Sequence, residues 1–411
     1  MKNPLITISL FFNYFVFAIL LNSVGTVILQ VQRNFDISKS DASVLEGFKD
    51  LPIAFASFIL ASFLPKIGLK KSMLIGLAFV TIACFLIPFS DGFWYFKLLF
   101  FVIGISFALI KVSVFATIGI ITKGVKEHGS FMSLLEATFM AGILIGNVVI
   151  SQYVNDNDPK SREWLTIYWM LSGLSFIAFL LLFIAKLDES EAKIANTTLK
   201  KDFQAMFSLI IKPLIIVFIF SIFFYVLLEQ SFQTWFPTFY QEILHAPSSM
   251  AIQAGAILAG ASFIGRLLSG FVLLRVRWIY FLSICLIIVA AIVLLVLPMA
   301  KSTVISNETM TWFNAPLVVY LLPIMGLFLA PIYPILNSTI LSALPKHMHS
   351  SMSGLIVVFS ALGGTTGSII TGHVFEKFDG TTAFYFSLIP ITVIFILLWI
   401  LNKLVHKMEL S

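Results

Sequence analysis

Twelve apolar runs, most of them about twenty residues or longer, dominate this sequence. They cover residues 5–31, 43–64, 72–90, 94–121, 130–152, 165–185, 213–241, 250–273, 279–299, 315–343, 352–374 and 382–402. Runs of this length cross a bilayer as α-helices, whereas the strands of a membrane barrel would alternate apolar and polar residues over about ten residues. Only 11% of the residues are charged and 59% are hydrophobic. The sequence therefore predicts an all-α membrane protein with twelve transmembrane helices.

One long polar segment, residues 186–204, interrupts the apolar pattern and divides the twelve helices six and six. We expect an N-terminal six-helix bundle over residues 1–186, a cytosolic linker over 187–206 and a C-terminal six-helix bundle over 207–411. Two equal bundles joined in this way are typical of a duplicated transporter whose halves move about a midplane site. Two independent domains joined by a tether are the alternative.

The distribution of basic residues sets the expected orientation. With a cytosolic N-terminus, the inner segments hold fifteen Lys and Arg residues and the outer segments six, as the positive-inside rule requires. We therefore expect both termini in the cytosol and an integral multi-pass protein of the bacterial inner membrane. The net charge of +6 then reflects topology and predicts no nucleic-acid partner.

Neither the cysteines nor the histidines suggest a metal or redox site. Cys84 and Cys285 lie inside apolar runs, where buried reduced thiols are expected. The six histidines are scattered near the ends of the predicted helices. We therefore expect no cofactor, no metal and no enzymatic activity.

Lys111 lies in the middle of an apolar run, about 18 Å from the polar turn that follows it. A charge at that depth costs at least a few kcal/mol and needs an anionic partner, a water-filled cavity or a ligand. Each of these implies a polar interior within the membrane. Lys111 is therefore a candidate for substrate binding or coupling.

A stripe of polar and aromatic residues follows the run at 213–241. Tyr225, Glu229, Gln233, Phe236 and Tyr240 recur at three- and four-residue spacing, and so share one face of a helix. Sugars offer hydroxyl groups for hydrogen bonding and C–H faces for stacking on rings, and this stripe supplies partners for both. Ordinary packing between helices is the alternative, although a carboxylate near the midplane without a role is rare.

Glu229 and Lys111 lie at similar predicted depth in opposite halves of the chain. They could form an ion pair that stabilises one gate state, bind opposite ends of a substrate, or carry proton coupling. A fixed structural pair is the alternative. Glu136 is a further candidate, either as the partner of Lys111 or as a residue that reaches the cytosolic surface.

Other polar residues within the predicted helices have a candidate role beside a structural one. Asn22 with Thr26, and Tyr333 with Asn337, are polar pairs at i, i+4, which serve either the cavity or interhelical hydrogen bonding. Arg266 is expected to brace helices more than to contact substrate. Residues 46–50, with Glu46, Lys49 and Asp50, are expected at the outer membrane interface.

The segment after the second run resembles a motif of the major facilitator superfamily. Lys66, Gly68, Lys70 and Lys71 fit that motif, whereas Ala61 replaces its glycine and Pro65 its aspartate. The resemblance spans the chain and implies the twelve-helix fold of secondary transporters. The missing acid leaves open whether the charge latch of the motif forms here.

A narrower resemblance is to the fucose permease-like branch, whose members are sugar/proton symporters. It rests on Gly265, Arg266, Gly270, Leu274 and Arg275 in the eighth run, and on Tyr333, Pro334, Ser338 and Leu341 in the tenth. Gly270 and Arg275 are expected to serve packing and gating, with close backbone approach at the glycine.

The sequence departs from that branch at its proton-binding acids. Ser23 follows Asn22 where such members carry an acid, and Lys111 replaces a second acid. The drug-antiporter branch fits less well, because the sequence Gly142 to Asn147 lacks its proline.

These observations predict a monomeric symporter in the lipid bilayer that moves a small polar solute, a sugar above all, by alternating access, with protons as a candidate coupling ion. The alternatives are a carrier of organic anions or amino-acid-like solutes, with Lys111 binding a carboxylate, and a proton-driven exporter. A membrane sensor or a lipid-handling protein is disfavoured, because we find no soluble effector domain in the sequence.

Overall fold

The computed structural model of the chain describes residues 4–122, 124–158, 160–189, 210–301, 310–344 and 349–409. Within these ranges the regular structure is helical and contains no strand. Among the described residues, eleven spans are long and apolar enough to cross a membrane, and the twelfth expected span forms helix α3 (Lys39–Ile67), which carries more charges. The prediction of an all-α membrane protein is confirmed.

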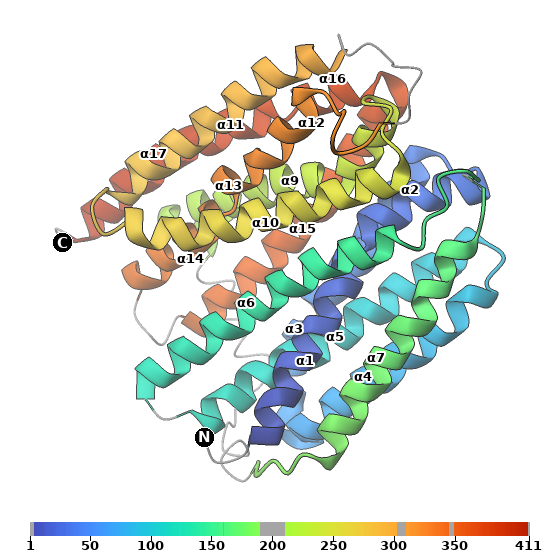
Figure 1. Cartoon of the computed structure of the whole chain (residues 1–411). Coiled ribbons are helices and arrows are strands. Elements are labelled where there is room, and N and C mark those ends of the chain that lie inside the picture. The colour runs from blue at the N-terminus through green and yellow to red at the C-terminus, as the bar shows by residue number, and fades with distance from the viewer. Residues whose placement is uncertain are drawn as a thin grey trace. The chain divides into compact units, whose positions relative to one another are not determined.

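The first half of the chain forms long helices joined by short turns (Figure 1). These are α1 (Pro4–Asn22), α2 (Val24–Phe35), α3 (Lys39–Ile67), α4 (Leu69–Leu86), the 3-10 turn η1 (Ile87–Phe89), α5 (Phe93–Ile121), α6 (Gly124–Ser151), the 3-10 turn η2 (Glu163–Thr166) and α7 (Ile167–Ile184). The predicted span 5–31 is thus interrupted at Ser23, which separates α1 from α2.

The second half is more broken. Its elements are α9 (Pro213–Glu242), α10 (Ser248–Val272), α11 (Trp278–Lys301), α12 (Leu317–Leu321), the 3-10 turn η4 (Leu322–Ile324), α13 (Met325–Leu329), α14 (Ile332–Ala343), α15 (His349–Lys377), α16 (Gly380–Tyr385) and α17 (Leu388–Glu409). The run predicted over 315–343 forms one candidate span, Leu317–Ala343, but its helix is interrupted at two places. Pro323 and Pro331 lie at these interruptions, where a missing N–H and a fixed φ disrupt the helical ladder, and Pro316 precedes α12 as its N-cap.

The chain forms two compact units. Unit 1 comprises Met1–Val24, Arg33–Asp36 and Phe48–Leu199, and unit 2 comprises Gly25–Gln32, Ile37–Gly47 and Lys200–Ser411. The boundary near residue 200 falls in the expected linker 187–206, of which residues 190–206 lie outside the described part of the chain. Two short segments of α2 and α3, which we expected in the N-terminal bundle, group with unit 2 because they pack on its helices.

In unit 1, α4 packs on α5 and α7, and α1 packs on α5, α6 and α7. Glycines allow several of these contacts. A Cβ atom at Gly104 of α5 would lie 2.4 Å from the carbonyl oxygen of Lys49, and one at Gly142 of α6 would lie 2.7 Å from that of Phe15. Side chains at these positions would separate the helices.

In unit 2, α9 packs on α10, α14, α15 and α17. Gly363 and Gly367 of α15 lie against the carbonyl oxygens of Phe223 and Leu227, and a Cβ at either glycine would lie 2.3 Å from that oxygen. Because these glycines are one turn apart, they form one flat face that lets α15 lie directly on α9. This contact fixes the helix that carries the predicted polar stripe.

Candidate functional site

Tyr225 and Glu229 lie one turn apart on α9 and contact each other. The Tyr225 hydroxyl donates to Glu229 Oε1 at 2.8 Å and lies 3.1 Å from the carbonyl oxygen of Leu329, at the end of α13. Tyr225 is fully buried, whereas Glu229 is half-buried. The i, i+4 spacing predicted from the sequence therefore produces a contact between Tyr225 and Glu229. The Tyr225 hydroxyl of this pair lies against the end of α13.

Arg266 of α10 is a positively charged neighbour of Glu229. It interacts electrostatically with Glu229 and with Tyr225. Its neighbour Gly265 lies against the carbonyl oxygen of Leu327, 2.1 Å from where a Cβ would stand. Pro331 has no N–H to donate to that carbonyl, so the break in the helix and the glycine together bring α10 close to α13.

Tyr333 and Asn337 contribute from α14. The Tyr333 ring lies 6.0 Å from the Tyr225 ring, and its hydroxyl lies 3.4 Å from Ser360 Oγ of α15. One turn further, Asn337 Oδ1 is buried and has no hydrogen-bond partner among the described residues. We name Tyr225, Glu229, Arg266, Tyr333 and Asn337 the C-terminal polar cluster.

The remaining stripe residues on α9 lie in more closed surroundings. Phe236 is fully buried and its ring lies 4.8 Å from the ring of Tyr240, so it belongs to the packed interior of unit 2. Gln233 is half-buried, and its carbonyl oxygen lies 3.2 Å from where a Cβ of Gly25 would stand. The stripe thus divides into a polar part around Glu229 and an apolar part toward the end of α9.

In unit 1, Lys111 is half-buried on α5, about 15 Å from the helix end at Ile121. Its Nζ lies 5.8 Å from the Phe107 ring centre and 6.0 Å from that of Phe115. Its charged neighbours are Glu136 of α6 and Asp50 of α3, and Glu136 has the larger electrostatic effect on Lys111. Glu136 itself is exposed, so its role as the partner of Lys111 and its alternative role at the cytosolic surface both stay predictions.

The pairing of Lys111 with Glu229 stays a prediction, because each has charged neighbours within its own unit.

Asn22 ends α1, and its Nδ2 donates to the Ala18 carbonyl oxygen of the same helix at 2.9 Å.

The loop that carries the superfamily motif is held by an acid from elsewhere. Gly68 adopts a φ of 98°, and the backbone N–H groups of Leu69 and Lys70 donate to the two carboxylate oxygens of Glu189 at 3.0 and 2.7 Å. Lys70 Nζ in turn donates to the carbonyl oxygens of residues 183 and 185 at the end of α7. Glu189 therefore caps the positive end of α4, although Pro65 replaces the aspartate of the motif.

The two expected gating residues after α10 lie in open surroundings. A Cβ at Gly270 would meet no atom within 4 Å, so the close backbone approach expected there is not found. Arg275 is exposed in the turn that follows α10. Close approach occurs instead at Gly265.

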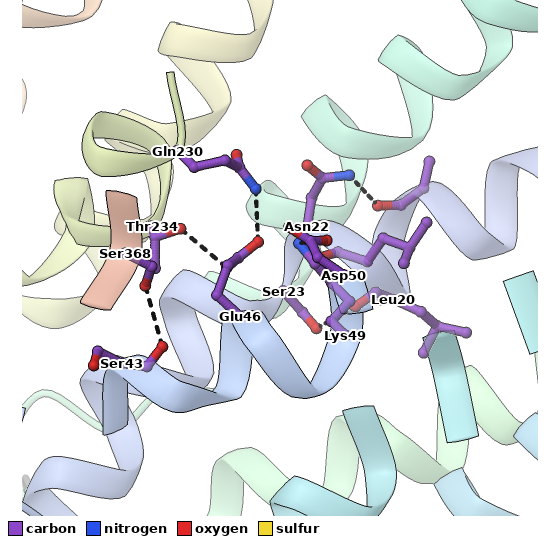
Figure 2. Close-up of polar contacts among 12 residues, drawn as sticks. Leu20, Asn22, Ser23, Ser43, Glu46, Lys49, Asp50, Gln230, Thr234 and Ser368 are labelled. Atoms are coloured by element: carbon purple, nitrogen blue, oxygen red, sulfur yellow. Dashed lines mark hydrogen bonds and ion pairs between the residues drawn. The ribbon is translucent and has the colours of Figure 1, made fainter. Parts of the chain in front are cut away.

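Sequence reasoning missed the role of Glu46 (Figure 2). Glu46 is fully buried rather than interfacial, and it accepts hydrogen bonds from Gln230 Nε2 at 2.6 Å and Thr234 Oγ1 at 3.0 Å. Lys49 is also buried, with Nζ 3.5 Å from Asp50 Oδ1. The interfacial expectation for Glu46 and Lys49 is wrong. A signal was present, because residues 39, 43, 46 and 50 are all polar and share one helix face.

No group of three His, Cys, Asp or Glu residues in the described part of the chain could hold a metal ion. Both cysteines are buried and free. The C-terminal polar cluster supplies hydrogen-bonding groups, charges and aromatic rings.

Comparison with known proteins assigns the chain to a family. It is 24% identical over 407 residues to the TsgA homolog of Buchnera aphidicola subsp. Schizaphis graminum, covering 96% of this chain and 95% of that protein. A mutant of the nucleoside transporter NupG has a similar fold, with a TM-score of 0.74 at 16% identity, covering 97% of this chain and 99% of NupG. The E. coli fucose:proton symporter FucP gives a TM-score of 0.62 at 16% identity, covering 97% and 98%. The sequence also matches the Major Facilitator Superfamily over residues 7–368. The chain is therefore a member of the Major Facilitator Superfamily of membrane transporters.

Proposed function

We propose that this transporter moves a small polar solute of the sugar class by alternating access, with protons as the coupling ion, in the bacterial inner membrane with both termini in the cytosol. The observation that carries the proposal is the C-terminal polar cluster, in which a carboxylate, a guanidinium group, two tyrosines and an amide lie on α9, α10 and α14. NupG and FucP, which share the fold, carry a nucleoside and fucose, and both solutes contain hydroxylated rings.

The chemistry of the cluster suits hydroxyl groups. Glu229 and the unpartnered oxygen of Asn337 accept hydrogen bonds, Arg266 donates them, and the rings of Tyr225 and Tyr333 present apolar faces. A sugar needs donors, acceptors and a flat surface for its C–H face. The turn at Pro331, between α13 and α14, also brings a backbone polar group to the cluster, because the Leu329 carbonyl oxygen lies 3.1 Å from the Tyr225 hydroxyl.

An organic anion is the second candidate, since Arg266 and Lys111 are both half-buried cations. Each of them interacts with at least one carboxylate, Arg266 with Glu229 and Lys111 with Glu136. A carboxylate on the solute would compete with these groups. A neutral polyol therefore fits the cluster better.

We assign Lys111 and Glu136 to coupling rather than to solute binding. Lys111→Met removes a half-buried charge and keeps about the same side-chain volume, so we expect a folded protein that binds solute but no longer accumulates it against a gradient. Wild-type accumulation by Lys111→Met, measured in proteoliposomes with an imposed pH gradient, would remove Lys111 from coupling.

The solute class is tested by thermal unfolding of the purified protein against hexoses, pentoses, nucleosides, amino acids and dicarboxylates. A solute that binds only the folded state raises the unfolding temperature. We expect stabilisation by a sugar or nucleoside, and its loss in Glu229→Gln but not in Glu163→Gln, a control at an exposed glutamate. Stabilisation by carboxylates alone would favour the anion carrier instead.

A further inference from the structure

The beginning of α3 is bound to the ends of α9 and α15. Lys39 Nζ lies 3.1 Å from Glu242 Oε2. The backbone N–H of Ser40 donates to Glu376 Oε2 at 2.7 Å, and the Ser40 hydroxyl contacts the same oxygen. Since Glu242 ends α9 and Glu376 lies in the last turn of α15, α3 runs antiparallel to both helices here.

The same face of α3 makes two further levels of contact (Figure 2). Ser368 Oγ of α15 donates to the carbonyl oxygen of Ser43 at 3.3 Å. Three residues further, Glu46 accepts from Gln230 at 2.6 Å and from Thr234 at 3.0 Å. Contacts at three- and four-residue spacing along one helix face form a continuous seam. We call this seam, Lys39, Ser40, Ser43 and Glu46 with their partners on α9 and α15, the α3 clasp.

The clasp is closely packed. A Cβ at Gly372 of α15 would lie 2.6 Å from Trp235 Cζ2 and 2.8 Å from Ser43 Cβ, and one at Gly25 of α2 would lie 2.7 Å from the Thr234 carbonyl oxygen. Glu46 has 0% of its surface exposed at the centre of this packing. A buried carboxylate is stable only while its hydrogen-bond donors are in place, so the contact of Glu46 with α9 is sensitive to any movement of that helix.

Helix α9 carries both the clasp and the C-terminal polar cluster. Gln230 follows Glu229 directly in the sequence, so a shift of α9 that accompanies solute binding also moves a donor to Glu46. We propose that Glu46 is the latch of a gate: while it holds Gln230 and Thr234 the start of α3 stays on α9, and its release lets the start of α3 separate from α9. Under the orientation expected from the basic residues, the clasp lies at the extracellular end of these helices. The inference rests on membership of the transporter family and not on the identity of the solute.

A cysteine probe inside the clasp tests the latch. Thr238 is fully buried on α9, four residues from both Thr234 and Glu242, and its hydroxyl has no hydrogen-bond partner in the described structure. Thr238→Cys is therefore a mild substitution within the seam. It is made with Cys84→Ser and Cys285→Ser, so that the probe carries the reactive thiol.

Labelling by a maleimide is measured on the full-length protein in detergent, which makes the result independent of membrane orientation. Glu46→Ala is expected to raise the labelling rate at Thr238→Cys about tenfold or more, since a carboxylate with two donors is lost from the closed state. Glu46→Gln, which keeps one acceptor oxygen, is expected to give an intermediate rate. The matched probe Ser175→Cys, fully buried on α7 of unit 1, is expected to keep its rate.

Two results overturn the proposal. One is an unchanged rate at Thr238→Cys in a folded Glu46→Ala protein, and the other is an equal increase at Thr238→Cys and Ser175→Cys, which indicates general loosening. Should Glu46→Ala fail to fold, Thr234→Val removes one donor at nearly constant volume and is measured in the same way. Loss of solute stabilisation with normal gating would contradict the proposed solute class and leave the latch intact.

Discussion

Tyr225→Phe separates a binding role of the C-terminal polar cluster from a packing role. The substitution removes one hydroxyl and keeps the ring that lies 6.0 Å from the ring of Tyr333. In the native protein this hydroxyl donates to Glu229 Oε1 at 2.8 Å and lies 3.1 Å from the Leu329 carbonyl oxygen. Glu229 then loses the contact that fixes its orientation.

The expected magnitude follows from that geometry. A hydrogen bond to a charged group contributes about 1.5–3 kcal/mol, and loss of the donor removes this partner from the half-buried Glu229. We therefore expect the free energy of unfolding to fall by about 1.5–3 kcal/mol. We also expect solute affinity to fall about tenfold, which corresponds to about 1.4 kcal/mol. The reason is that the Glu229 carboxylate is no longer held in the orientation in which it binds the solute.

Tyr240→Phe is the matched control on the same helix. Tyr240 is also fully buried, and its hydroxyl donates to the Val319 carbonyl oxygen at 2.5 Å, away from the cluster. Its loss should cost about 1 kcal/mol of stability and leave solute affinity unchanged. Unfolding in detergent and isothermal titration of the identified solute measure both quantities. Equal, wild-type affinity in the two variants would refute the assignment of Tyr225 and Glu229 to solute binding.

Three further predictions follow from the packing and the topology. Gly367→Ala places a Cβ 2.3 Å from a backbone carbonyl of α9 and should destabilise by about 1–3 kcal/mol, whereas Gly270→Ala meets open space and should keep or raise the unfolding temperature; equal temperatures would contradict the packing argument. Glu189→Ala removes the acid at the start of α4 and should lower the free energy of unfolding by about 1 kcal/mol, and an unchanged value would show that the cap is dispensable. Asp188→Cys should react with an impermeant reagent from the cytosolic side alone, and Asn157→Cys from the outside alone; the opposite pattern would reverse the proposed orientation.

The sequence predicted the helices well, because the length of an apolar run and the cost of unpaired backbone groups in lipid leave little alternative. It also placed Tyr225 and Glu229 together, since an i, i+4 spacing is a local property of a helix. The division of the span 315–343 was missed, although Pro323 and Pro331 lie at the places where it is divided. Proline alone does not say whether a helix kinks or breaks.

Contacts between distant segments could not be read from local patterns. Glu46 was expected at the interface because it follows a polar turn, yet its partner Gln230 lies 184 residues away in the sequence. The acid that caps α4 likewise comes from Glu189, 120 residues beyond Leu69. In both cases the carboxylate was visible in the sequence, and its donors depend on how the helices pack.

Counterflow in proteoliposomes tests the central claim, that the C-terminal polar cluster binds the solute which this transporter moves. Vesicles are loaded with the solute identified by thermal unfolding, and uptake of the radiolabelled solute is followed in the wild type and in Glu229→Gln. We predict rapid exchange by the wild type and at least a tenfold slower exchange by Glu229→Gln, because the variant loses the charged acceptor that meets the solute hydroxyls. Wild-type exchange by a folded Glu229→Gln protein would contradict the account.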